Sequence, residues 1–167
     1  MPLRRLVILS GLALVAVMGI GPTAALAAAH GTDRPLTGSS TGSLTASLVT
    51  GAATSSFTGN LSHLGAITGG DVAVLTATRR ATFTYTGTDT LVAANGDELF
   101  SDFTGSGVFT STATVESTQV NTITGGTGRF ADASGTFTIT ISGVIVAISA
   151  TSETTHNTDV FNGKISY

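Results

Sequence analysis

Apolar and polar residues alternate along much of the chain, and the clearest example starts at Thr136. The six residues from Thr136 to Ile141 read Thr-Phe-Thr-Ile-Thr-Ile, so the apolar side chains recur at every second position. This period of two places them on one face of a β-strand and the threonines on the other. Similar runs are separated by glycines at intervals of roughly 8 to 12 residues, which is typical of a sandwich or a barrel.

These runs predict an all-β fold with eight strands and no long amphipathic helix. Thr and Val dominate the runs, and their branched Cβ atoms suit a pleated strand. Closing the strands into a single antiparallel barrel leaves no open sheet edge. We expect some of the longer runs to bend or split at glycines. The expected strands lie near residues 42–50, 54–68, 72–78, 80–94, 98–105, 107–124, 135–151 and 157–167.

A glycine-rich stretch after residue 124 is expected to form a tight corner between two strands. It reads Gly-Gly-Thr-Gly-Arg-Phe-Ala and returns through Ala-Ser-Gly-Thr-Phe to the alternating run. Part of it matches G-x-G-x-x-A, but the long helix that would hold a pyrophosphate is missing, so no dinucleotide site is expected. We predict that the ring of Phe130 turns inward as a plug. The residues assigned to this structural corner are Gly125, Gly126, Gly128, Phe130 and Gly135.

The same corner resembles that of allene oxide cyclase-like and dirigent-like barrels. More closely, the chain resembles small secreted bacterial members of that superfamily without an assigned function. Ser-His-Leu-Gly at 62–65, Ala-Ala-Asn-Gly-Asp-Glu-Leu at 93–99 and Phe-Asn-Gly-Lys-Ile-Ser-Tyr at 161–167 carry the rest of the resemblance. It implies a calycin-like, eight-stranded antiparallel barrel. It carries over no catalytic residues, because no position beyond the corner matches the functional residues of the plant cyclases or the dirigent proteins.

The first 29 residues have the pattern of a helical secretory signal peptide. Arg4 and Arg5 precede an apolar run from Leu6 to Ile20, and small residues suited to signal-peptidase cleavage follow. The run is shorter than the roughly 20 residues that a spanning helix needs. We therefore expect a secreted or otherwise extracytoplasmic protein with no stable membrane span after cleavage.

The remaining chain of about 138 residues is long enough for one domain with its own core. Residues 30–41, rich in Gly, Pro, Ser and Thr, are predicted to be a flexible leader, and residues 42–167 to be the barrel. The chain has seven Lys and Arg and ten Asp and Glu; without Arg4 and Arg5 the balance is five against ten, a net charge of −5. So few basic residues disfavour a nucleic-acid partner. The chain has no cysteine, which excludes disulfides and thiolate metal sites.

Three polar residues are candidates for the wall of a ligand pocket: His63, Glu98 and Arg129. His63 has a side chain that titrates near neutral pH. Arg129 either receives an anionic group or ties down the glycine corner through loop carbonyls or Asp132, and we favour the structural role. No motif of a hydrolase, a metal site or a cofactor-binding loop is present, so no catalytic residue, metal or cofactor is predicted.

Asn95 and Gly96 lie between two strand-like runs and predict a hairpin with a type I′ turn, because both residues accept positive φ. Asp97 and Glu98 follow at once. Adjacent residues on a strand point to opposite faces, so these two carboxylates do not converge on one site. We expect a solvated turn there.

The barrel suggests three functions. The first is a secreted or envelope-associated module that binds a small apolar ligand, because eight strands enclose either packed side chains or one small ligand. The second is a cyclase-type or dirigent-type enzyme that steers a reactive intermediate by shape, although no catalytic set points to an enzyme. The third is a structural surface protein or a small outer-membrane barrel. An apolar cavity of about 300 Å³ or more with His63, Glu98 or Arg129 in its wall would favour the first two.

Overall fold

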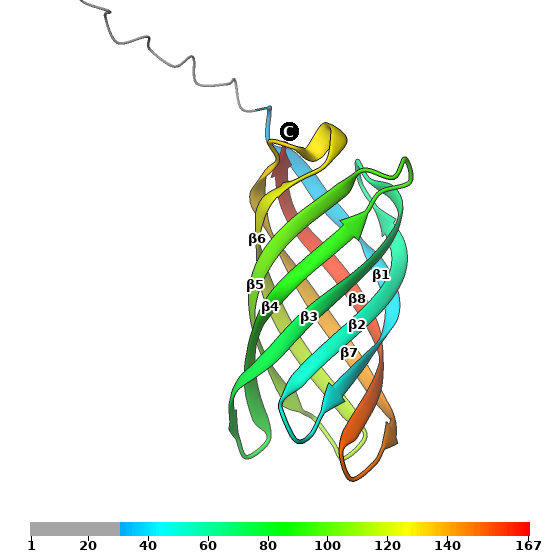
Figure 1. The fold of residues 1–167 in the computed structure, drawn as a ribbon, viewed down its shortest axis with the longest axis vertical. Coiled ribbons are helices and arrows are strands. Elements are labelled where there is room, and N and C mark those ends of the chain that lie inside the picture. The colour runs from blue at the N-terminus through cyan, green and yellow to red at the C-terminus, as the bar shows by residue number, and fades with distance from the viewer. Residues whose placement is uncertain (1–30) are drawn as a thin grey trace, which may run out of the picture.

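The computed structural model describes residues 31–167 and confirms a closed barrel of eight antiparallel strands (Figure 1). Each strand pairs with the next one in the chain, and the first pairs with the last. The predicted signal peptide lies outside the described residues. The strands are β1 (Arg34–Ser47), β2 (Ala52–Leu61), β3 (Gly65–Arg79), β4 (Thr82–Val92), β5 (Glu98–Phe109), β6 (Thr114–Gly126), β7 (Ser134–Ile148) and β8 (Ser152–Ser166).

The strand limits correct three expectations. Most of the predicted flexible leader belongs to β1, which begins at Arg34 and pairs with β8 from Arg34 opposite Ile165 to Ser47 opposite Ser152. This strand closes the barrel. The runs expected as single strands at 54–68 and 107–124 each contain a tight turn, so each contributes to two strands.

The β4–β5 hairpin lies where Asn95 and Gly96 predict it, but its turn is not of type I′. Gly96 has a φ of 87°. Among the described non-glycine residues only His63 and Arg80 have a positive φ, so Asn95 does not. The Gly96 N–H donates to the Ala93 carbonyl over 2.9 Å, and the Ala93 N–H donates to the Asp97 carbonyl over 2.8 Å. The loop is therefore longer than a two-residue turn, and only its glycine needs the left-handed region.

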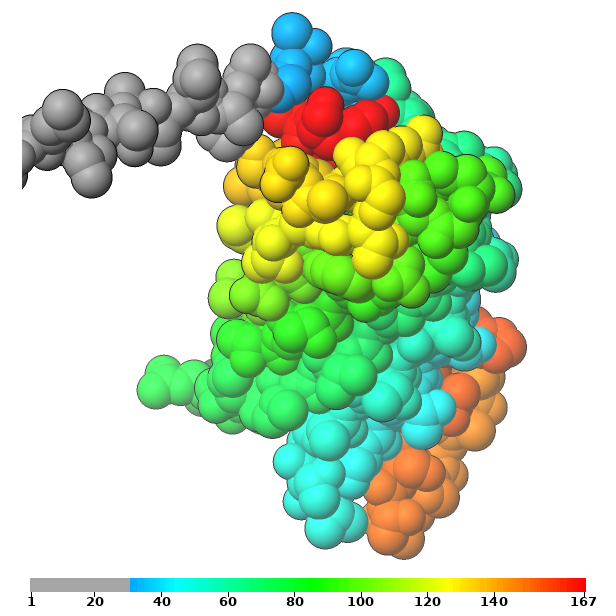
Figure 2. Space-filling view, turned by 45° about the horizontal axis from the view of Figure 1, so that its top comes forward, coloured from blue at the N-terminus to red at the C-terminus, as the bar shows by residue number. Residues whose placement is uncertain are grey.

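One end of the barrel is filled by the main hydrophobic core, and we call it the plugged end. It bears the short helix η1 (Gly128–Phe130) and the C-terminal Tyr167. Phe130 is fully buried, and its ring meets that of Tyr167 edge-on with centroids 5.0 Å apart. Figure 2 shows the yellow segment that contains η1 lying across this end beside the red C-terminus. The inward turn of Phe130 follows from the corner, where Gly128 has a φ of 54°.

The opposite end, which we call the open end, carries four of the seven connections between strands (β1–β2, β3–β4, β5–β6 and β7–β8) and a smaller core. Its buried members are Ala53, Ala73, Tyr85 and Phe103. Several rings here lie across a glycine on the neighbouring strand. Tyr85 is directly opposite Gly105, and Phe103 is opposite Gly87. A Cβ on either glycine would collide with the ring, so these glycines allow the rings to lie against the barrel wall.

We expect the plug to supply much of the stability. Replacing Phe130 with alanine should lower the free energy of unfolding by about 3–5 kcal/mol, because it removes a fully buried ring from a filled core. Phe109 is half-buried at the open end, so Phe109→Ala should cost less than about 2 kcal/mol. Urea denaturation of both variants measures the difference. Equal losses would contradict the division into a plugged and an open end.

Candidate functional site

The open half of the barrel contains a cavity of about 580 Å³. The β1–β2 turn at 48–51 forms part of its wall, so the cavity reaches the open end. Its volume falls within the range of about 300–1,000 Å³ that is typical of small-molecule sites. Apolar side chains from all eight strands line it, including Leu44, Ala53, Phe83, Tyr85, Phe109 and Ile141.

A belt of inward-facing polar side chains lies between the cavity and the plug, and we call it the polar belt. It includes three carboxylates, Asp71 on β3, Asp89 on β4 and Asp159 on β8. Asp71 and Asp159 line the cavity directly. Asp89 is directly opposite Asp71 in the strand register and is 3% exposed. The neutral members are Ser40, Ser55, Ser101, Gln119 and Asn121.

Two serines hold two of the carboxylates in place. The Ser55 hydroxyl donates to Asp71 Oδ2 over 2.6 Å, and the Ser40 hydroxyl donates to Asp159 Oδ2 over 2.7 Å. Asp71 Oδ1 is buried and accepts no hydrogen bond. Neither side-chain oxygen of Asp89 accepts one either. The belt therefore presents carboxylate oxygens with unused acceptor capacity inside the barrel.

The carboxylates hold protons more tightly than they would in water. Burial, followed by the negative charges of Asp71 and Asp159, raises the pKa of Asp89 to about 8, and the nearby Thr90 backbone N–H offsets only part of this. Burial raises the pKa of Asp159 to about 6, against the hydrogen bond from Ser40. Burial also raises the pKa of Asp71. These directions follow from taking a charge out of water and placing like charges together.

The other side of the belt is neutral and interconnected. Asn121 is fully buried, and its Oδ1 accepts from the Ser101 hydroxyl over 3.3 Å and from Gln119 Nε2 over 3.1 Å. Its Nδ2 has no hydrogen-bond partner. One amide oxygen thus joins β5 to β6.

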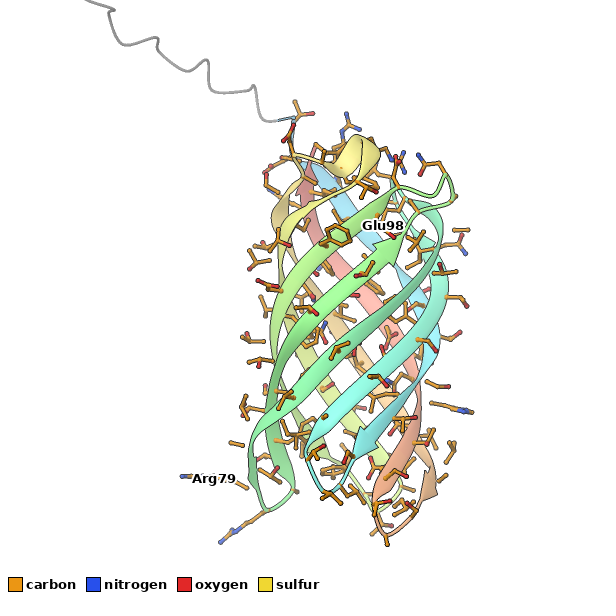
Figure 3. All side chains as sticks on the ribbon, in the orientation of Figure 1. Arg79 and Glu98 are labelled. Carbon is orange, nitrogen blue, oxygen red and sulfur yellow. The ribbon has the colours of Figure 1, made fainter. Side chains whose placement is uncertain are left out.

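No positively charged side chain of residues 31–167 lines the cavity. Arg79 lies at the tip of the β3–β4 hairpin and points away from the barrel (Figure 3). His156 is exposed on β8. Among the described residues, no group of three or more His, Cys, Asp or Glu side chains is placed to hold a metal ion. The same part of the chain contains no helix with the length and hydropathy of a membrane span.

The three residues predicted for a pocket wall all lie toward the plugged end, away from the cavity. His63 is exposed in the β2–β3 turn with a φ of 67°, and Glu98 begins β5 at the same end (Figure 3). Arg129 is exposed in η1. None of the three lines the cavity. The structure also brings no two of them into a hydrogen bond or an ion pair among the described contacts.

Arg129 ties down the glycine corner, as the structural alternative predicts, but its partner is Asp97 rather than Asp132. Arg129 Nε lies 3.7 Å from Asp97 Oδ2, and the Arg129 backbone N–H donates to the same oxygen over 3.3 Å. Its guanidinium carbon lies 4.6 Å from the centre of the Phe130 ring. Asp97 is therefore more than a solvated turn residue, because it links the β4–β5 loop to the corner.

Sequence reasoning missed the polar belt, although its signal is present. Asp89 has the same parity as Phe83, Tyr85 and Leu91 along β4, so it occupies the apolar face of an alternating strand. Asp159 likewise shares a face with Phe161. An acidic residue on an inward face is the feature that could have identified the site.

Comparison with known proteins identifies no relative of this chain. No protein-family model, no curated protein and no solved structure matches the chain. The functional argument therefore depends on the residues of this chain.

We predict that Asp89 makes the protein less stable as the pH rises. Its pKa is about 8 in the fold, against 3.8 without burial, so the folded state binds the proton more tightly than the unfolded state. The free energy of unfolding should fall as the pH rises from about 4 to about 8. Asp89→Asn removes this charge and gives Asp71 an N–H donor. It should add on the order of 3 kcal/mol at pH 8 and little at pH 4.

Chemical denaturation of the wild type and the variant across this pH range measures the effect. Asp102→Asn is the matched control, because Asp102 is exposed on the outer face of the neighbouring strand β5. It should leave the pH dependence unchanged. A variant Asp89→Asn that loses stability at pH 8 would contradict the assignment of a strained, buried carboxylate.

Proposed function

We propose that the protein is an exported binding barrel that holds one small, largely apolar ligand in its open half. The observation that carries this proposal is the cavity of about 580 Å³ with aromatic and aliphatic walls and an opening at one end. A barrel of eight strands that served only as a rigid body would be more stable with its interior packed. The export part of the proposal depends on the predicted signal peptide, which lies outside the described residues.

The outer wall supports a barrel surrounded by water rather than by lipid. Five of the six outward positions of β4 are threonine, and the sixth is Val92; the threonines are Thr82, Thr84, Thr86, Thr88 and Thr90. The exposed Val72 and Val74 of β3 pair with two of these threonines. A lipid-facing barrel presents an apolar band with aromatic girdles instead. We therefore favour a binding module over a small outer-membrane barrel.

A cyclase-type or dirigent-type enzyme, which the resemblance of the glycine corner suggests, is the second candidate. One observation favours it: Asp89 has a pKa of about 8 and so carries a proton at neutral pH inside the barrel. A buried carboxylic acid of this kind serves as a proton donor in some enzymes. Binding is the simpler function, because the cavity alone supports it.

The binding proposal predicts that filling the cavity weakens the binding of a neutral apolar probe. Ala46 lines the cavity, so Ala46→Phe should weaken the binding of Nile red roughly tenfold or more, which is about 1.4 kcal/mol or more. Ala52→Phe places the same side chain on the exposed face of β2 and should leave binding unchanged. Fluorescence titration of the three proteins measures both effects. A wild type that does not bind Nile red, or equal binding by both variants, would contradict the proposed site.

A further inference from the structure

The charge inside the barrel is one-sided. Three carboxylates of the polar belt, from Asp71, Asp89 and Asp159, face inward, and Glu153 lines the cavity nearer the open end. No Lys, Arg or His of residues 31–167 lines the cavity beside them. Buried carboxylates are normally paired with a cation or fully hydrogen-bonded, because an isolated charge is costly in an apolar environment. No side chain of residues 31–167 supplies a positive charge beside these carboxylates at the inner end of the cavity.

The unused hydrogen-bonding capacity on this side of the belt is of one type. Both side-chain oxygens of Asp89, together with Asp71 Oδ1 and Asn157 Oδ1, are buried and have no hydrogen-bond partner. All four are acceptors once Asp89 loses the proton that it holds at neutral pH in the empty cavity, and a positive charge beside Asp89 favours that loss. Asp71 and Asn157 line the cavity, and Asp89 lies directly opposite Asp71 across the strands. The serine bonds to Asp71 and Asp159 hold those side chains while leaving other acceptor positions free. A ligand that matches this site must therefore supply donors.

A bare metal ion matches the site poorly. Hard cations need six or more converging oxygen atoms, and the described residues contain no group of acidic side chains placed to hold a metal. An ammonium group is a better match, since it carries three N–H donors and no acceptor. The wall between the belt and the open end is largely apolar, with Leu44, Phe83 and Phe109 among its residues, and Glu153 is its one acidic side chain. That wall suits a hydrocarbon or aromatic body attached to the ammonium group.

We propose that the ligand is an amphipathic organic cation, a primary amine on an apolar body. Its ammonium group lies at Asp71, Asp89 and Asp159, and its apolar part extends toward the open end. This assignment rests on the proposed binding function and specifies the ligand class for the same cavity. The carboxylates are already desolvated and held in position before the ligand binds. Forming the ion pair therefore loses less free energy to desolvation and ordering of the protein side chains.

Three probes with the same chain and different head groups test the assignment: decylammonium, decanol and decanoate. We expect decylammonium to bind the wild type at pH 7 roughly tenfold or more tightly than decanol, and decanoate to bind most weakly. The triple variant D71N/D89N/D159N, which removes all three carboxylates of the belt, should bind decylammonium and decanol with similar affinity. Its affinity for decanol should equal that of the wild type, which also shows that the variant is folded. Isothermal titration calorimetry measures all the affinities.

The matched control is D102N/E116Q, which removes two exposed carboxylates from the outer wall. It should keep the preference for decylammonium, because the preference comes from the belt and not from the net negative charge. If decanol binds as tightly as decylammonium, or if D71N/D89N/D159N keeps the preference, the cation assignment is overturned while the binding function stands. If none of the three probes binds, the binding function itself fails.

Discussion

The contact between aromatic rings and glycines on neighbouring strands is the constraint on which the open half depends. Tyr85 opposite Gly105, and Phe103 opposite Gly87, lie where any Cβ would overlap the ring. With those positions empty, the rings rest against the wall. Had the wall carried larger residues there, the rings would have been forced toward the barrel axis, and the interior would be closer to filled. Two glycines thus help to decide whether this barrel has a cavity.

The barrel tolerates the cavity because the packing that stabilises the fold is concentrated at the plugged end. Phe130, Phe137 and Phe161 are almost completely buried in the plugged end, together with most of the leucine and isoleucine side chains of the core. Empty volume and buried polar groups both reduce stability, and the open half contains both. The glycine corner connects the two requirements. It turns Phe130 inward, and Arg129 and Asp97 hold it to the β4–β5 loop.

Sequence alternation predicts the all-β fold, and the glycine-rich stretch predicts the inward turn of Phe130, because both depend on local patterns. Alternation does not show the turns at 62–64 and 110–113, which lie inside runs expected as single strands. It also fails at the start of β1, where Leu36 is the one apolar inward residue before Gly38, Ser40 and Gly42, so the strand resembles a polar linker. That stretch is a strand only because β2 and β8 pair with it on both sides. Such a pairing is a long-range property that no local pattern reveals.

The candidate site shows the same limit. His63, Glu98 and Arg129 stand out in the sequence beside turns, where functional side chains are often found. The carboxylates of the belt lie within three strands separated by up to 88 residues of sequence, from Asp71 to Asp159. The sequence shows which face of its strand each carboxylate occupies. Whether the three carboxylates meet inside the barrel depends on the strand register and on the closure of the barrel. The structure supplies both.

The two sides of the polar belt differ in charge and in hydrogen bonding. On the β5–β6 side, Ser101, Gln119 and Asn121 are neutral and share hydrogen bonds, which is how a buried polar layer is ordinarily satisfied. On the β3–β4 side, Asp71 and Asp89 are placed directly opposite each other, an arrangement that destabilises a sheet. Serine or asparagine in place of Asp89 would serve the fold better. The fold does not need the acidic side of the belt, and the ammonium ligand that we propose would account for it.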